Sequence, residues 1–149
     1  MSRFGGRVVL VTGSSSGIGY ATAEAFLEEG AKVAITGRDA ARLKRAEKAL
    51  KRLGKVFAIQ GDVSVAADVK RFVTETTKVL GPIDVLVNNA GIYVNKPVEE
   101  FSEEEYDAVM DINLKGTFLC TKYVIPSMVR RKRGAIVNVA SDSGLVGTA

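Results

Sequence analysis

Short apolar runs alternate with longer amphipathic stretches along the chain. The runs are rich in β-branched residues and apolar at successive positions, which is typical of strands buried on both faces of a sheet. They cover residues 8–11, 32–36, 55–59, 83–87 and 135–139. Helical periodicity predicts helices over residues 18–29, 39–53, 65–79 and 103–131. Strands that alternate with helices indicate a doubly wound α/β fold, in which helices cover both faces of a parallel sheet.

Residues with strong positional preferences mark several of the helix ends. Glycines follow the first three predicted helices, as expected of helix-terminating residues. Asp39 is the expected N-cap of the second helix. Ser102, which is followed by three glutamates, is the expected N-cap of the fourth. Pro126 should kink the fourth helix or begin its final turns.

Length and charge place few limits on function. The chain of 149 residues predicts one domain over 1–149, and 21 Lys and Arg against 17 Asp and Glu give a net charge of +4. The basic run Arg130–Arg133 is interpreted as a solvated helix end, so we expect no nucleic-acid partner. No apolar run reaches the roughly 20 residues of a membrane span. The N-terminal segment lacks a signal-peptide cleavage site, and we expect a cytoplasmic protein with no membrane partner.

Missing residue types exclude several kinds of catalytic site. The sequence holds no histidine and one cysteine, Cys120. It therefore cannot form a histidine-based triad, a histidine-containing zinc site or an internal disulfide. We expect no metal site, and we expect Cys120 to be a buried small apolar residue.

A glycine- and serine-rich segment follows the first apolar run and leads into the first helix. It reads Thr-Gly-Ser-Ser-Ser-Gly-Ile-Gly over residues 12–19. Bare backbone N–H groups at a helix N-terminus form an anion site that suits a pyrophosphate. The spacing G-x-x-x-G-x-G is neither the commonest dinucleotide fingerprint nor a phosphate-binding loop of the Gly-Lys-Ser/Thr type. The alternative is an ordinary strand-to-helix turn.

Polar residues also follow three of the other predicted strands. Asp62 and Val63 follow the third, Asn88-Asn89-Ala90-Gly91 follows the fourth, and Ser141 follows the fifth. The carboxyl ends of parallel strands share one edge, where ligands bind. Each residue type also has a purely structural alternative: an Asx turn for the aspartate, a tie between loops for the asparagines, and a turn or cap for the serine.

Asn113 interrupts the apolar pattern of the last predicted helix. Its neighbours on either side are Ile112 and Leu114. A polar amide among apolar residues costs free energy unless its hydrogen bonds are satisfied. Asn113 is therefore a candidate functional residue, and a surface amide is the alternative.

Taken together and in this order, these motifs resemble the short-chain dehydrogenase/reductase family. The resemblance implies a Rossmann-like sheet of strand order 3-2-1-4-5, with the C-terminal strands missing. It implies that Asn113 distorts its helix and holds a water for proton relay, and that the Ser141 hydroxyl holds the substrate oxygen as a catalytic residue. The implied cofactor-binding residues are Gly13, Ser14, Ser15, Ser16, Gly17, Ile18, Gly19, Arg38, Asp62, Val63, Asn89, Ala90 and Gly91.

One part of the family pattern is absent. The family's proton donor is a tyrosine followed four residues later by a lysine, beyond the catalytic serine. Eight residues follow Ser141, over 142–149, and the sequence holds no Tyr-x-x-x-Lys anywhere. We therefore expect an N-terminal part of a longer enzyme, inactive by itself, with its fifth strand left as an exposed apolar edge.

The residues after the second predicted strand bear on the choice of cofactor. Gly37 stands where the family carries the acidic residue that selects NAD, and Arg38 follows with a side chain suited to a phosphate. Asp39 is better explained as a helix cap, although it could select NAD one position late. Ser16 stands where many NADP-dependent relatives carry a second basic side chain. We predict that NADP(H) is favoured and that NAD(H) remains possible.

The sequence thus leads to one main hypothesis and one alternative. The main hypothesis is an oxidoreductase that moves hydride between a nicotinamide cofactor and a ketone or secondary alcohol. The alternative is a non-catalytic nucleotide-binding fragment. Apolar residues on more than one face of the 103–131 helix, together with the resemblance, also predict a homodimer or homotetramer through that helix.

Overall fold

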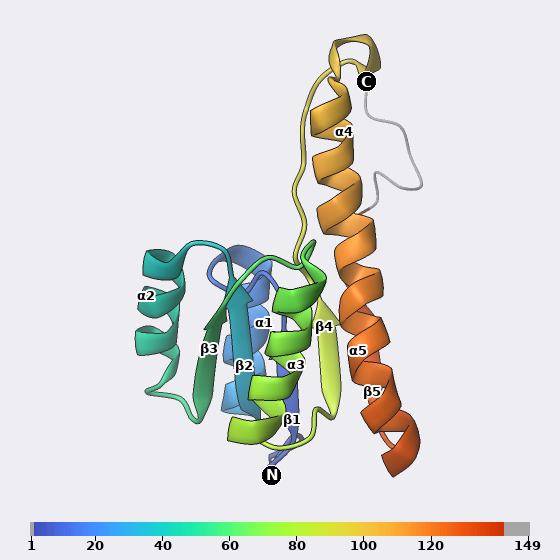
Figure 1. Ribbon diagram of the computed structural model, residues 1–149. Helices are drawn as coiled ribbons and strands as arrows, with labels where there is room; N and C mark the ends of the chain where they lie inside the picture. The colour runs from blue at the N-terminus through green and yellow to red at the C-terminus, as the bar shows by residue number, and fades with distance from the viewer. Residues whose placement is uncertain (1, 142–149) are drawn as a thin grey trace.

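A five-stranded parallel sheet forms the centre of the structure, a computed structural model that describes residues 2–141 (Figure 1). The strand order is β3-β2-β1-β4-β5, as predicted. The strands are β1 (Val8–Val11), β2 (Lys32–Gly37), β3 (Val56–Gln60), β4 (Val85–Asn88) and β5 (Ala135–Asn138). All four neighbouring pairs are parallel. The order reverses between β1 and β4, which opens a crevice at their carboxyl ends.

Helices cover both faces of the sheet. They are α1 (Gly17–Glu28), α2 (Ala40–Leu50), α3 (Ala66–Val79), α4 (Glu103–Val109) and α5 (Gly116–Arg131). Successive residues of β1 alternate between two cores: Val8 and Leu10 pack with α3 and α5, and Val9 and Val11 pack with α1 and α2. This burial on both sides explains why the strand is continuously apolar.

The predicted 103–131 helix is not one continuous α-helix. It begins as predicted at Ser102, whose side chain forms a capping box with Glu105. A π-helical segment, Met110–Lys115, then separates α4 from α5, and Asn113 lies within it. Such π-segments are rare and often occur at functional sites. The α5 helix continues through Pro126 to Arg131.

Two members of the predicted solvated basic run are in fact ion-paired. Asp84 is 7% exposed and accepts hydrogen bonds from the backbone N–H of Val8 (3.0 Å) and from Arg131 Nη1 (2.9 Å). Arg133 Nη2 lies 3.1 Å from the same carboxylate. Burial by itself raises the pKa of Asp84, but these bonds and charges outweigh it and hold the pKa below its usual value. The arginines thus tie the end of α5 to the starts of β1 and β4.

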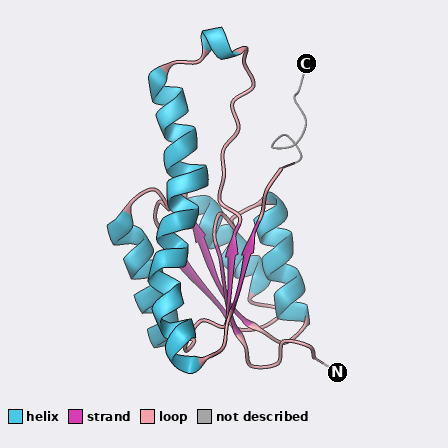
Figure 2. Cartoon of the chain, turned by 90° about the vertical axis from the view of Figure 1, so that its right-hand side faces the viewer, coloured by secondary structure: helices cyan, strands magenta, loops and turns pink. Residues whose placement is uncertain are grey.

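The described chain leaves an apolar strand exposed at one edge of the sheet. Strand β5 lies at the edge of the sheet, where Val137 and Val139 are exposed, as predicted. In Figures 1 and 2 the strands point toward one end of the sheet, and α4 rises beyond that end. Among the described residues, no helix is long and apolar enough to cross a membrane.

Candidate functional site

The turn between β1 and α1 needs its glycines for close packing. Gly13 has a φ of 62°, and a Cβ there would lie 2.7 Å from the Cα of Ala90. A Cβ on Gly19 would lie 2.6 Å from the carbonyl oxygen of Gly13. Gly17 differs, because its φ is 57° but no atom lies within 4 Å of the position of a Cβ. Two glycines therefore bring the turn against the segment after β4, while Gly17 leaves open space at the start of α1.

The start of α1 carries no side-chain cap. Ser16 is the N-cap, but its side chain makes no capping hydrogen bond, and the first turn holds no acidic residue. The first N–H groups of a helix lack partners within the helix and carry the positive end of its dipole. Together with the open space beside Gly17, they fit a pyrophosphate group.

The three serines of the turn have different surroundings. Ser14 is fully buried, and its hydroxyl donates to the carbonyl oxygen of Val11 (2.7 Å) and accepts from the N–H of Thr36 (3.0 Å). It therefore ties the turn to β2, and its side chain is already engaged inside the protein. Ser15 and Ser16, together with Ile18, instead line a cavity at the carboxyl edge of the sheet.

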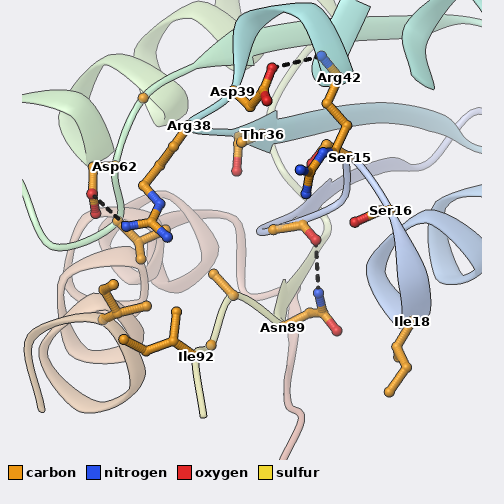
Figure 3. Close-up of a pocket in the computed structure, with 17 residues that line it drawn as sticks. Ser15, Ser16, Ile18, Thr36, Arg38, Asp39, Arg42, Asp62, Asn89 and Ile92 are labelled. Carbon is orange, nitrogen blue, oxygen red and sulfur yellow. Dashed lines mark hydrogen bonds and ion pairs between the residues drawn. The ribbon is translucent and has the colours of Figure 1, made fainter. Parts of the chain in front are cut away.

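The Asn-Asn-Ala-Gly segment is bound directly to the glycine turn. Thr12 Oγ1 accepts hydrogen bonds from the N–H groups of Asn89 and Ala90, each at 3.0 Å. Asn89 Nδ2 donates to the carbonyl oxygens of Thr12 (3.0 Å) and Gly13 (3.1 Å). The predicted tie between neighbouring loops is therefore present, and it fixes two walls of the cavity relative to each other (Figure 3).

Asn88 makes a second tie, on the side of β5. Its Nδ2 donates to Thr121 Oγ1 (3.2 Å) in α5 and to Asn138 Oδ1 (2.9 Å) at the end of β5. Ser141 follows three residues after Asn138, at the carboxyl edge of the sheet. Ser141 does not line the cavity.

Asp62 serves both a turn and the cavity wall. Its Oδ1 accepts from the N–H (2.8 Å) and hydroxyl (2.7 Å) of Ser64, which is the Asx turn expected as its structural alternative. Its Oδ2 lies 3.7 Å from Arg38 Nη1. Val63 is buried and packs close to Gly116, and it also lines the cavity.

Asn113 is exposed, but both polar atoms of its side chain make a hydrogen bond. Its Oδ1 accepts from the N–H of Ile92 (2.8 Å), and its Nδ2 donates to the carbonyl oxygen of the same residue (2.9 Å). Its own carbonyl oxygen accepts from Thr117 Oγ1 (2.9 Å). The side chain therefore holds the irregular segment that follows Gly91, and Asn113 is an exposed amide with its own hydrogen bonds.

These elements enclose one cavity of about 520 Å³ beyond the carboxyl ends of the strands. That volume is typical of small-molecule and cofactor sites. It lies where the strand order reverses, as expected for ligands of open α/β sheets. Its lining (Figure 3) is Gly13, Ser15, Ser16, Ile18, Thr36, Gly37, Arg38, Asp39, Arg42, Gly61, Asp62, Val63, Asn89, Ala90, Gly91, Ile92 and Ile112.

Sequence analysis missed one charged residue of this lining, Arg42. Asp39 caps α2 as predicted, because its Oδ1 accepts from the N–H of Arg42 at 2.9 Å. This hydrogen bond also holds the pKa of Asp39 below its usual value. The cap places the first turn of α2 beside the end of β2. The position of Arg42 within that turn is therefore the sequence signal that could have indicated that it lines the cavity. Within residues 2–141, no group of three or more Cys, Asp and Glu side chains is placed to hold a metal ion.

The fold and the position of the cavity define a Rossmann-like α/β protein with its ligand site at the carboxyl edge of the sheet. The family model for short chain dehydrogenases matches residues 7–149. The chain therefore belongs to the short-chain dehydrogenase family, which confirms the resemblance inferred from the motifs.

Individual relatives cover nearly all of this chain. It is 45% identical over 145 residues to an uncharacterized oxidoreductase of Thermotoga maritima, covering 97% of this chain and 57% of that protein. It is 40% identical over 146 residues to the NADP-dependent (R)-specific alcohol dehydrogenase of Lentilactobacillus kefiri, covering 97% and 58%. The crystal structure of levodione reductase superposes with a TM-score of 0.94 at 39% identity, covering 99% of this chain and 58% of that one. The chain thus spans less than two thirds of the length of these relatives.

Proposed function

We propose that the full-length protein is an oxidoreductase that transfers hydride between NADP(H) and a ketone or secondary alcohol. The observation that carries the proposal is the cavity at the switch point, walled by an uncapped helix start on one side and by arginines on the other. When bound, the nicotinamide supplies the hydride chemistry. The residues of this chain bind the cofactor, orient it and close the site around it.

Each site residue has a distinct part in this proposal. The turn from Gly13 to Gly19 binds the pyrophosphate, and Asp62 and Val63 lie against the adenine. Asn89, Ala90 and Gly91 form the opposite wall. Asn113 holds the segment at Ile92 in place, lies in the π-helical distortion of its helix, and holds a water for proton relay. The Ser141 hydroxyl holds the substrate oxygen.

The proposal is tested by turnover of the full-length protein and of the 149-residue chain. We expect the full-length protein to change the nicotinamide absorbance with ketones or secondary alcohols. We expect the 149-residue chain to bind cofactor without turnover, because it lacks the Tyr-x-x-x-Lys pair. Turnover by the 149-residue chain at a rate comparable to that of the full-length protein would contradict the proposal that this chain binds cofactor without catalysing the reaction.

The preference for NADP(H) rests on the end of β2. Gly37 offers no carboxylate to bind the ribose hydroxyls, and Asp39 is engaged as the cap of α2. The guanidinium of Arg38 faces the cavity and suits a phosphate. The NADP-dependent alcohol dehydrogenase of L. kefiri, a relative at 40% identity, supports this choice.

The test of cofactor preference compares kcat/KM for NADP and NAD in the wild type and in Arg38→Ala. The substitution should cost roughly 1.5–3 kcal/mol with NADP, as for a lost hydrogen bond to a charged group, and little with NAD. Equal losses with both cofactors, or a wild-type preference for NAD, would refute the assignment.

The two-sided apolar character of α4, the π-segment and α5 favours self-association. One face, including Leu119 and Val124, is buried against the sheet. A second face carries exposed apolar side chains, namely Tyr106, Met110, Leu114, Phe118, Ile125 and Val129. In Figure 1 α4 stands beyond the sheet, and the segment that leads into it runs alongside, where Lys96 pairs with Glu105.

The proposed assembly is a homodimer or homotetramer through this second face. Light scattering of the full-length protein at micromolar concentration should give a multiple of the monomer mass, and Phe118→Glu should reduce it. A monomeric mass for the wild type would refute the assembly.

A further inference from the structure

Two arginines approach the β2 end of the cavity from different directions. Figure 3 shows Arg38 extending across the cavity toward Asp62, whereas Arg42 descends from the first turn of α2 toward Ser15. Between them lies the end of β2, where Gly37 contributes no side chain. A Cβ on Gly37 would lie 3.2 Å from Ser15 Oγ, so this hydroxyl also stands beside the strand end.

The two arginines differ in how far their charge is already used. Arg38 Nη1 lies 3.7 Å from Asp62 Oδ2, so its charge is partly balanced within the protein. The Arg42 side chain forms no hydrogen bond or ion pair with the part of the chain that the structure describes. The nearby carboxylate of Asp39 is committed to the backbone N–H of Arg42. The Arg42 charge acts on Asp39 through space, but its guanidinium donors have no hydrogen-bond partner among the described residues and are therefore available at the cavity.

We propose that Arg42 is a second cationic residue for the 2′-phosphate of the cofactor, opposite Arg38. This inference rests on the proposed NADP(H) function. A phosphate monoester carries a charge of about −1.5 to −2 at neutral pH, which one arginine shared with Asp62 does not balance. Ser16 does not provide a second basic side chain. Arg42 provides it from α2.

The same arrangement explains how Arg38 is held before the phosphate arrives. The ion pair with Asp62 keeps the Arg38 guanidinium at the cavity wall, and a bound phosphate competes with Asp62 for it. Because the Arg38 side chain is 59% exposed, this pair is weak and gives way readily. Arg42 has no ion pair to break within the described chain, so its guanidinium donors can bind the phosphate directly.

The test measures binding without any redox step. Adenosine 2′,5′-bisphosphate and adenosine 5′-monophosphate differ only in the 2′-phosphate, and both are titrated into the full-length protein by calorimetry. Arg42→Ala should weaken binding of the bisphosphate roughly tenfold, equivalent to about 1.4 kcal/mol, and leave the monophosphate unchanged. Alanine is a good helix former, and the backbone N–H bonded to Asp39 remains.

Lys44→Ala is the matched control. Lys44 lies on the same helix and is exposed, but it does not line the cavity, so its loss removes one positive charge without touching the site. It should leave both affinities unchanged. Arg42→Lys should keep part of the preference for the bisphosphate, because the charge remains while the planar donor fork is lost.

The outcomes separate this inference from the proposed cofactor preference. Wild-type protein that binds both nucleotides equally would overturn the NADP(H) preference and the role of Arg42 with it. A wild-type preference for the bisphosphate that survives Arg42→Ala but disappears in Arg38→Ala would overturn only the role of Arg42. An equal loss of bisphosphate affinity in the Lys44→Ala control would attribute the effect to long-range charge. That result would also overturn the role of Arg42.

Discussion

Replacing Thr12 by valine should damage both stability and cofactor binding. Thr12 is 1% exposed, and its hydroxyl oxygen accepts the N–H groups of Asn89 and Ala90 at 3.0 Å each. Valine has nearly the same shape but no acceptor. The substitution therefore leaves two backbone donors without their partner at the junction of the two cavity walls.

The expected cost follows from these two hydrogen bonds. A buried donor that loses its acceptor costs about 1–3 kcal/mol. Asn89 and Ala90 are only partly buried, and water from the cavity can reach them, so we take the lower half of the range for each. The sum is about 2–4 kcal/mol in the free energy of unfolding. Thr12→Ser is the matched control, because it keeps the hydroxyl and loses one methyl group, worth about 1 kcal/mol.

The assay is urea unfolding of the full-length variants at equal protein concentration, with a parallel titration of NADPH. Valine should lower the unfolding free energy more than serine does, and it alone should weaken cofactor binding several-fold. If the valine variant were as stable as the serine variant and bound cofactor as well as wild type, the reasoning from the Thr12 hydroxyl would be wrong.

Three further substitutions or treatments test other parts of the structure. Asp84→Asn should lower the unfolding free energy by roughly 1–3 kcal/mol at neutral pH. Because the folded pKa of Asp84 is depressed, its contribution is present above the unfolded pKa of about 3.9 and is lost as pH falls through the folded value. A difference between the two proteins that stayed constant down to the lowest pH would contradict this. Gly13→Ala should abolish cofactor binding, because its Cβ would meet Ala90 at 2.7 Å, whereas Gly6→Ala, at a φ of 72° with open space around it, should cost stability alone. Equal cofactor binding by these two variants would refute the packing argument. Burial raises the pKa of the Cys120 thiol to about 12, so a thiol reagent near neutral pH should label it only after unfolding; rapid labelling of the native protein would place the thiol at the surface.

Most of the fold could be predicted from the sequence because its elements are marked locally. Continuous apolar runs flank the amphipathic helices, and Asp39 and Ser102 cap their helices with hydrogen bonds to residues three positions away. Such signals depend on neighbours in the chain, so they are visible without tertiary structure. The glycine turn and the residues after each strand could be placed at one edge of the sheet for the same reason, since parallel strands share their carboxyl end.

Which side chains meet across the chain was decided only by tertiary structure. Arg131 pairs with Asp84 across 47 residues, which no local pattern of charges indicates. The Ser14 side chain points into the protein, where its hydroxyl accepts a hydrogen bond from the backbone N–H of Thr36 in β2 at 3.0 Å. Asn113, within the π-segment, likewise makes two hydrogen bonds to Ile92, which lies on a separate segment of the chain.

The cavity, too, was determined partly by local sequence and partly by tertiary structure. Its position was determined by the order of strands and helices, and its glycine wall by the motif after the first strand. The contribution of Arg42 depends on the angle at which α2 leaves β2 and on the absence of a side chain at Gly37 between them. Sequence alone sets the turn of a helix on which a residue lies, but the packing of that helix on the sheet decides what the side chain faces.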